Sequence, residues 1–311
     1  MPLRRLRWHK HLPIAGTAAE PVKQLNLWPR IPTLIEGADR SNLGRVLNLE
    51  PARCRMAMES KRVRQAAAQA LQGAALPAVA SREEFETQLD RLRVREKEHT
   101  HEGDAIAADR RRLPMVEVSS ATILTGPSGP LTLLDSFEGR QQLIAYYFMW
   151  HEARPAQEQC QGCTWVTAHM GELSYLHARD VTFAVFAQGP YPESVRYRDF
   201  MGWQMPWYSA SGSLEVLLAG RRIGRMHLVC YVRSGSKIYE TYWTTSRGVE
   251  VMDNSYHLLD LTVYGRQEKH EDSPRGWPQA YSIGEWTMDG RPVSQWPRIE
   301  AGRRDNLTDE S

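Results

Sequence analysis

The sequence predicts an α/β protein, in which a mixed β-sheet carries helices on both faces. Two apolar runs, 141–150 (QQLIAYYFMW) and 181–188 (VTFAVFAQ), are typical of strands. The first is apolar enough to be buried on both sides, as central parallel strands are. From Leu143 onward, the order is strand, helix, strand, helix, two strands and helix. This alternation favours a mixed sheet covered by helices on both faces.

The basic charge of the chain is concentrated at its N-terminal end. Residues 1–55 hold ten Lys and Arg against four Asp and Glu, so the remainder, with 29 basic and 33 acidic residues, has a net charge of −4. We therefore expect no nucleic-acid partner for the main body, and no membrane partner. No apolar run approaches the roughly 20 residues of a membrane-spanning helix. Only four cysteines occur in 311 residues, which favours a reducing, cytoplasmic location.

Composition and periodicity divide the chain into four parts. Residues 1–55 contain six prolines and no sustained helical or strand period, so we expect a disordered extension, or a gene-model artefact upstream of a true start at Met56 or Met58. Residues 56–115 are predicted to form a helical extension that packs on the core. Residues 116–268 carry the α/β domain, and residues 269–311 are expected to form a partly ordered tail.

Two helical stretches make up the predicted N-terminal helical extension. The alanine-rich run 59–72 (ESKRVRQAAAQALQ) has high helix propensity. The next helix is expected to begin at Ser81, because Ser81 and Glu84 have the spacing of a capping box. A separate helical piece is expected between Ile106 and Leu113, ending before Pro114.

The remaining elements of the predicted α/β domain follow in order. Two short strands flank a turn at Gly126–Gly129, and a hairpin turns at Ser234–Ser236. The expected elements are strands at 115–118, 121–124, 141–150 and 181–188, helices at 164–179 and 191–203, an extended segment at 205–210, a hairpin over 225–243 and a closing helix at 247–265.

This element order, with a Cys-x-x-Cys pair after the central strand, resembles that of thioredoxin. Several stretches between residues 81 and 268 also resemble, in order, one bacterial family, domain-of-unknown-function family 899. They include SREEFETQLDRLRVREKEHT, GPSGPLTLLDSFEGRQQLIAYYFMW, CQGCTW, FMGWQMPWYSASGS and TYWTTSRGVEVMDNSYHLLDLTVYGRQE. The resemblance implies a thioredoxin-like fold, and it implies little about activity, because fold alone does not determine function.

Cys160 and Cys163 are the candidate catalytic residues. A Cys-x-x-Cys pair at the start of a helix, next to a βαβ pattern, is typical of redox proteins. Free backbone N–H groups and the helix dipole stabilise a thiolate at that position. Cys160 would attack an oxidised sulfur or a peroxide, and Cys163 would resolve the intermediate by closing a disulfide. The expected partners are an oxidised protein or small disulfide substrate and a dithiol reductant, with no cofactor; the oligomeric state is not predicted.

Four further residues are candidates for supporting this pair. His151 follows the central strand and could relay a proton, Trp165 could shield the disulfide, and Arg247 could bind an anion at the start of the last helix. Thioredoxins place a cis-proline opposite the cysteines, but Arg225-Met226-His227 contains none. Pro206 is the nearest candidate for that role. Each of these four side chains has an alternative structural role in packing or solvation.

Two alternatives to redox catalysis remain open. One is a non-catalytic binding or scaffold module, which would use the hairpin, the N-terminal helices and the aromatic residues Trp203 and Trp207 to hold a partner. The other is a metal site, which would need ligands beyond one cysteine pair. His169 lies six residues after Cys163, which places it off the face of the helix that carries that cysteine.

Overall fold

The computed structural model describes residues 60–305 and residue 307. All of them belong to one of the chain's two compact units, Arg55–Ser311. The predictions made for residues 1–55, and for the first residues of the helical extension, lie outside the described residues.

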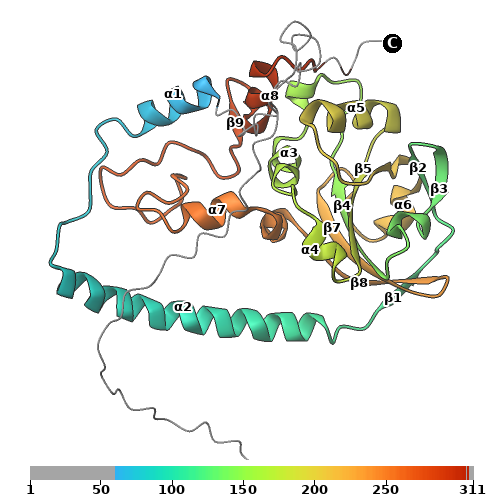
Figure 1. The fold of residues 1–311 in the computed structure, drawn as a ribbon, viewed down its shortest axis with the longest axis horizontal. Helices are drawn as coiled ribbons and strands as arrows, with labels where there is room; N and C mark the ends of the chain where they lie inside the picture. Colours follow the sequence, from blue (N-terminus) through green and yellow to red (C-terminus); the bar gives the residue numbers. More distant parts are fainter. Residues whose placement is uncertain (1–59, 306, 308–311) are drawn as a thin grey trace, which may run out of the picture. The chain divides into compact units, whose positions relative to one another are not determined.

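An eight-stranded mixed sheet forms the centre of the protein, in the order β1-β8-β7-β4-β5-β6-β2-β3 (Figure 1). Strand β4 pairs in parallel with β5 and antiparallel with β7, which is in turn antiparallel to β8. This arrangement of β8, β7, β4 and β5 is that of the thioredoxin fold, and the predicted fold class is confirmed. The strands are β1 Val116–Val118, β2 Ile123–Gly126, β3 Gly129–Thr132, β4 Gln142–Phe148, β5 Val181–Ala187, β6 Trp207–Ser209, β7 His227–Ser234 and β8 Lys237–Thr245.

Strand β4 is buried on both faces, as its sequence predicts. Leu143, Ala145 and Tyr147 point into one apolar cluster and Tyr146 and Phe148 into the other, and all five are 0% exposed. Successive strand residues point to opposite faces. A strand that separates two cores must therefore be apolar at every position, which explains the unbroken apolar run.

Helices cover both faces of the central strands (Figure 1). The cluster around Tyr146 contains residues of α3 and α5, and the cluster around Tyr147 contains residues of α6 and of the 3-10 helix η1. The elements of this region are η1 Asp135–Phe137, η2 Ala156–Glu158, α3 Gln161–Ala168, α4 Ser174–His177, α5 Tyr191–Met201, η3 Ser211–Ser213, α6 Leu214–Leu217, η4 Ser246–Met252 and α7 Asn254–Leu259.

Two predicted helices are broken in the structure. The stretch 164–179 divides into α3 and α4, because α3 stops at Ala168 and Gly171 lies in the irregular link between them. The closing helix divides into η4 and α7. Asp253 causes this second break, because its carboxylate accepts the N–H groups of Ser255 and Tyr256 and so begins a new helix.

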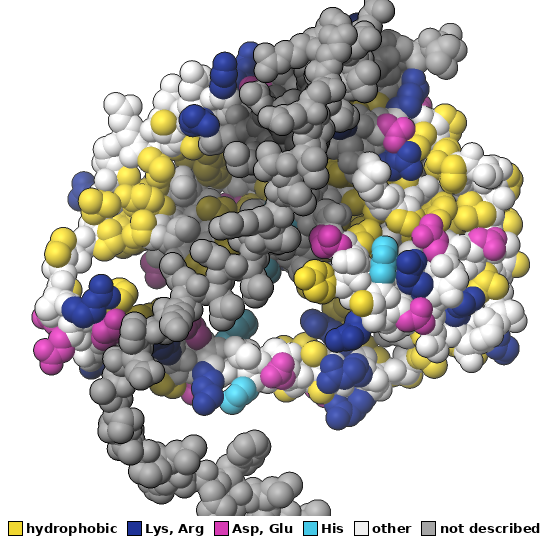
Figure 2. All heavy atoms as spheres, in the orientation of Figure 1, with side chains coloured by type: hydrophobic (Ala, Val, Ile, Leu, Met, Phe, Trp, Pro, Cys, Tyr) yellow, Lys and Arg dark blue, Asp and Glu magenta, His cyan; other side chains and the backbone are white. Residues whose placement is uncertain are grey.

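The helical extension contains α1 Lys61–Ala70 and α2 Arg82–Arg110. The predicted capping box is present, since Ser81 and Glu84 exchange hydrogen bonds at the start of α2. α2 continues through the break expected at Ile106, because no proline interrupts it. Lys and Arg side chains gather near its end (Figure 2), where three arginines follow one another from 110 to 112. No residue of α2 is buried, and packing of this extension on the core stays a prediction.

Residues 281–300, which we call the C-terminal segment, pack on α3 and on α1. The segment contains β9 Thr287–Met288, β10 Arg291–Pro292, η5 Val293–Gln295 and α8 Trp296–Glu300. Ser60 donates a hydrogen bond to Glu300 at 2.8 Å, and Arg62 pairs with Asp289 at 3.2 Å. The start of α1 is therefore held by the C-terminal segment.

Candidate functional site

Cys160 occupies the N-cap position of α3, in the loop that follows β4. Its backbone is not yet helical, with φ −52° and ψ 111°, and its sulfur accepts the backbone N–H of Cys163 at 3.3 Å. The first N–H groups of a helix have no partner within the helix. The sulfur takes the place that a serine or aspartate oxygen has in an ordinary cap. The predicted position of this cysteine at a helix N-terminus is therefore present.

Cys163 lies one turn into α3 and faces the core. It is 0% exposed, and its sulfur accepts the backbone N–H of Met149 at 3.3 Å. Met149 directly follows β4, so this contact links the second cysteine to the end of the central strand. Both cysteines are free thiols in the structure.

The two thiols differ in acidity. The pKa of Cys160 is lowered, mainly because the Cys163 thiol donates a hydrogen bond to it and further because the backbone N–H groups of Cys163 and Gly162 point at it; burial opposes this shift. The pKa of Cys163 is raised, chiefly by burial and then by the neighbouring Cys160 sulfur. Cys160 is therefore the thiol that ionises first.

A buried polar chain lies directly behind Cys160. Thr164 donates a hydrogen bond to the carbonyl of Cys160 at 2.9 Å, and its hydroxyl lies 2.7 Å from that of Tyr197. Gln295, from the C-terminal segment, donates to the same Tyr197 hydroxyl at 2.7 Å. Burial raises the pKa of Tyr197, so it remains a neutral hydroxyl. This chain was not predicted, because its members come from three distant parts of the sequence.

The C-terminal segment is fastened to the cysteine loop by three further hydrogen bonds. Arg291 donates to the side chain of Gln157 at 3.0 Å, Gln295 donates to the carbonyl of Ala156 at 2.8 Å, and the backbone N–H of Trp286 donates to the side chain of Gln161 at 3.3 Å. With this cover in place, Cys160 is 9% exposed. The C-terminal segment is thus part of the wall around the two cysteines.

Gly162, between the two cysteines, has no room for a side chain. A Cβ atom at this position would lie 2.9 Å from a ring carbon of Trp286 and 3.1 Å from the methyl group of Met226. Met226 belongs to the stretch before β7 where thioredoxins carry their cis-proline. In this protein, a methionine and a tryptophan of the tail therefore cover the start of α3.

The four predicted supporting residues do not converge on the cysteines. Exposed His151 contacts the carbonyl of Glu158 through Nδ1 at 2.8 Å, and exposed Arg247 pairs with Glu250 at 2.7 Å. Trp165 stacks on Trp286 with ring centroids 4.3 Å apart. Pro206 precedes β6, where its carbonyl accepts the N–H of Val185 at 2.9 Å. No cis peptide bond occurs in the described part of the chain. Catalytic roles for these residues stay predictions.

The third described cysteine and the acidic and histidine side chains form no second site of this kind. Cys230 lies in β7, and burial raises its pKa to about 11, so it behaves as a small apolar residue. Within residues 60–305 and 307, no three His, Cys, Asp or Glu side chains gather as metal ligands would. None of the helices in that part is both long enough and apolar enough to cross a membrane.

Comparison with known protein families identifies the chain. The model of the family described as "Bacterial protein of unknown function (DUF899)" matches residues 74–289. The chain belongs to this family. The match includes the sheet, both cysteines and the first part of the C-terminal segment, whereas α1 and residues 290–311 lie outside it. The family resemblance seen in the sequence is therefore confirmed.

Three solved structures to which the chain is similar are peroxiredoxins. The peroxidoxin BcpB of Mycobacterium tuberculosis is 12% identical, with a TM-score of 0.32, over 46% of this chain and 89% of its own. A cysteine-to-serine mutant of peroxiredoxin Q from Xanthomonas campestris is 11% identical, with a TM-score of 0.33, over 46% and 92%. A cysteine-to-serine mutant of peroxiredoxin 6 from Arenicola marina is 11% identical, with a TM-score of 0.31, over 57% and 87%. No curated protein matches the chain.

Proposed function

We propose that this protein is a thiol–disulfide oxidoreductase in which Cys160 is the attacking thiol and Cys163 the resolving thiol. The observation that carries the proposal is the backbone N–H of Cys163 directed at the Cys160 sulfur at 3.3 Å. A thiolate at a helix N-terminus is stabilised by such N–H groups and by the helix dipole. The raised pKa of Cys163 fits the second role, because a resolving thiol stays protonated until it is needed.

The reaction consists of two thiol–disulfide exchange steps, in which atoms and electrons balance. The Cys160 thiolate attacks one sulfur of a substrate disulfide, forms a mixed disulfide and releases the other sulfur as a thiolate. Cys163 then loses its proton, attacks the Cys160 sulfur and releases the second substrate thiolate. The substrate has gained two electrons, and the protein holds a Cys160–Cys163 disulfide. A dithiol reductant restores the pair.

The substrate class proposed is an oxidised protein or a small disulfide. The limited exposure of Cys160, 9%, favours small or extended substrates while the C-terminal segment is seated. A reducing compartment such as the cytoplasm would supply the dithiol reductant.

Trapping of a mixed disulfide tests the proposal. In Cys163→Ser, the resolving thiol is missing, so Cys160 should stay linked to its substrate and should be found by mass spectrometry after non-reducing electrophoresis. Cys160→Ser is the matched control and should trap nothing when Cys54 and Cys230 are replaced by serine in both variants, so that neither can form an adduct. The proposal fails if the two variants capture the same species, or if neither forms an adduct with the small aromatic disulfide 5,5′-dithiobis(2-nitrobenzoate).

A second candidate function is a non-catalytic binding module. The observation that favours it is the cover over the dithiol, where Trp286 and Met226 lie against Gly162. This function predicts that a Cys160→Ser/Cys163→Ser double variant keeps full activity in cells, whereas the oxidoreductase loses it. Comparing that double variant with the wild type in a deletion strain separates the two candidates.

A further inference from the structure

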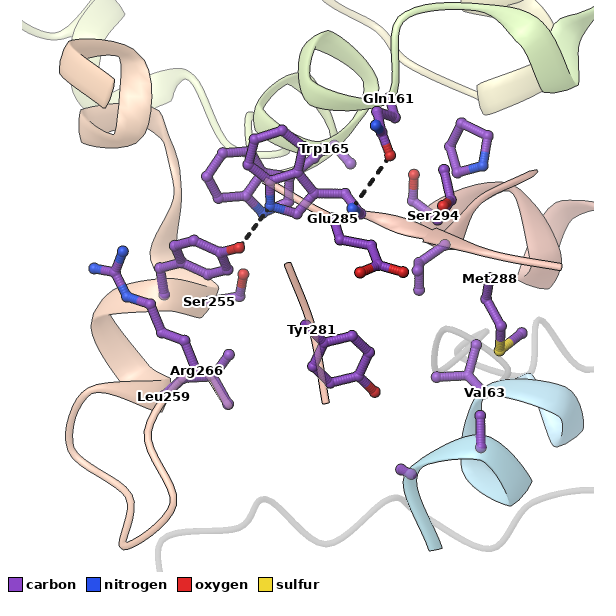
Figure 3. Close-up of a pocket in the computed structure, with 18 of the residues that line it drawn as sticks. Val63, Gln161, Trp165, Ser255, Leu259, Arg266, Tyr281, Glu285, Met288 and Ser294 are labelled. Atoms are coloured by element: carbon purple, nitrogen blue, oxygen red, sulfur yellow. Dashed lines mark hydrogen bonds between the residues drawn. The ribbon is translucent and has the colours of Figure 1, made fainter. Parts of the chain in front are cut away.

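A cavity of about 390 Å³ lies beside α3, on the side that carries Gln161, Trp165 and His169 (Figure 3). Its wall is completed by α7, by Val63 and its neighbours in α1, and by the C-terminal segment from Tyr281 onward. The volume falls within the range of about 300–1,000 Å³ that is usual for small-molecule sites. The two cysteines are not among the lining residues, so this cavity is separate from the dithiol.

Most aromatic rings of the wall already have partners. Trp286 stacks on Trp165, and the Tyr256 ring lies 4.6 Å from that of Trp165. Arg266 covers Tyr256 at 4.3 Å from its centroid. Tyr281 differs, because it forms no ring or cation–π pair within the described residues. The ring is half-buried and borders the open space of the cavity (Figure 3).

The charges of the wall are also mostly balanced. The Arg266 guanidinium pairs with Asp260 at 2.7 Å and with Glu250 at 3.4 Å, and His169 lies 3.1 Å from the Asp253 carboxylate. Among these side chains, the basic groups already face carboxylates. They leave no free positive charge for an anionic ligand.

One of the two acidic groups of the wall is less well matched. Glu268 is buried, accepts hydrogen bonds from Tyr256 and from the backbone of Gly284, and lies 3.5 Å from Nδ1 of His270, so its oxygens already have partners. Glu285 is exposed; within the described residues it accepts one hydrogen bond, from the backbone N–H of Ser282 at 2.8 Å, and no Lys or Arg forms an ion pair with it. Figure 3 shows Glu285 and Tyr281 directed into the same space. An exposed carboxylate without a cationic partner thus borders the same cavity as a tyrosine ring.

We propose that this cavity binds an organic cation, a substituted ammonium group on an apolar body. The ammonium would lie between the Glu285 carboxylate and the Tyr281 ring, which combines charge attraction with a cation–π contact. The apolar body would pack against Val63, Leu259 and Met288, which line the cavity. The proposal does not depend on turnover of Cys160.

Part of the proposed site lies beyond the region that the family model matches. Val63 and its neighbours in α1, together with Pro292 to Ser294, line the cavity but lie outside that match. These two parts of the chain contact one another through Ser60 and Glu300. The groups proposed to hold the ammonium, Glu285 and Tyr281, therefore lie within the family region, whereas part of the remaining wall lies beyond it.

Three probes of one shape test the charge preference: 3-phenylpropylammonium, 3-phenylpropanol and 3-phenylpropanoate. Isothermal titration calorimetry on the whole protein at neutral pH should give the tightest binding for the ammonium and the weakest for the carboxylate. Equal affinity for all three, or no binding of the ammonium, would overturn the proposal. Binding of the ammonium should be unchanged in Cys160→Ser/Cys163→Ser, which separates this result from any failure of the redox function.

Substitutions in the wall then locate the site. Glu285→Gln should weaken ammonium binding roughly fivefold and leave the alcohol unaffected, since it removes a charge at an exposed position, where solvent screens it. Glu172→Gln is the matched control, because exposed Glu172 also accepts a backbone N–H, from Ser174, outside the cavity. Ala66→Phe should reduce binding of all three probes by filling the cavity. The proposed location of the binding site is contradicted if Glu285→Gln binds the ammonium as Glu172→Gln does, or if Ala66→Phe leaves binding of the probes unchanged.

Discussion

Trp286 stacks face to face on Trp165, with ring centroids 4.3 Å apart and 12° between the ring planes. Trp165 belongs to the helix that begins at Cys160, and Trp286 belongs to the C-terminal segment, 121 residues further along the chain. The indole N–H of Trp286 also donates to the Tyr256 hydroxyl at 2.8 Å. One aromatic residue of the tail therefore links the cysteine helix to α7.

Removing Trp286 should make Cys160 more reactive. Trp286→Ala takes away the ring that covers Gly162 and stacks on Trp165, so iodoacetamide should alkylate Cys160 several times faster. The lost packing should also lower the free energy of unfolding by about 2 kcal/mol, below the usual cost of a fully buried tryptophan because this ring is half-buried. Alkylation followed by mass spectrometry, and urea unfolding, measure the two effects. Trp243→Ala is the control, since Trp243 is exposed and lies on β8; equal rates in both variants would contradict the prediction.

Adding one methyl group at Gly162 should displace the same tryptophan. In Gly162→Ala, the new Cβ would meet Trp286 at 2.9 Å and Met226 at 3.1 Å. We expect faster alkylation of Cys160 and a loss of about 1–3 kcal/mol in stability, as for overpacked interiors. Gly171→Ala is the matched control, because nothing lies within 4 Å of a Cβ there. A Gly162→Ala protein as stable and as slowly alkylated as Gly171→Ala would show that the contact is unimportant.

The central part of this architecture could be predicted because residues that are close together in the sequence determine it. The apolar run of β4 must be buried on both faces, and a cysteine pair after such a strand predicts a helix that begins at the first cysteine. The Ser81–Glu84 capping box likewise needs only four consecutive residues. Signals of this kind depend on neighbours in sequence, and the structure contains each of them.

The surroundings of the cysteines could not be predicted in the same way. The cover over the site depends on pairs such as Gln295 with Tyr197 and Trp286 with Trp165, which are separated by 98 and 121 residues. The sequence of the C-terminal segment has no helical or strand periodicity that would show where the segment packs. Helix breaks were missed for a related reason, since Asp253 forms a new cap inside a sequence that could otherwise continue as one helix.

The reaction rate of Cys160 should depend on pH through its lowered pKa. The thiolate is the reactive form. Alkylation should therefore reach half of its maximal rate below pH 9, which is the ordinary pKa of a cysteine thiol. Cys163→Ala removes the largest cause of the shift, the donated S–H, and should move this midpoint to higher pH. Stopped-flow alkylation between pH 5 and pH 10 gives both midpoints. An unchanged or lower midpoint in Cys163→Ala would exclude the hydrogen bond as the cause.

Tyr197→Phe should loosen the tail without exposing a new apolar surface. The substitution removes a hydroxyl that lies 2.7 Å from Thr164 and accepts from Gln295 at 2.7 Å. Both partners keep another hydrogen bond, Thr164 to the Cys160 carbonyl and Gln295 to the Ala156 carbonyl. The free energy of unfolding should therefore fall by only about 1 kcal/mol, less than when a buried polar group is left without a hydrogen bond. Urea unfolding measures this loss, and Tyr191→Phe, at a half-buried site in the same helix, should cost less. If the Tyr197–Gln295 hydrogen bond holds the C-terminal segment on the cysteine loop, hydrogen exchange should rise at the backbone N–H of Val293 and its neighbours. Exchange that stays the same as in Tyr191→Phe would assign that task to the Trp286 stack and to the bonds from Arg291, Trp286 and Gln295 to the cysteine loop and α3.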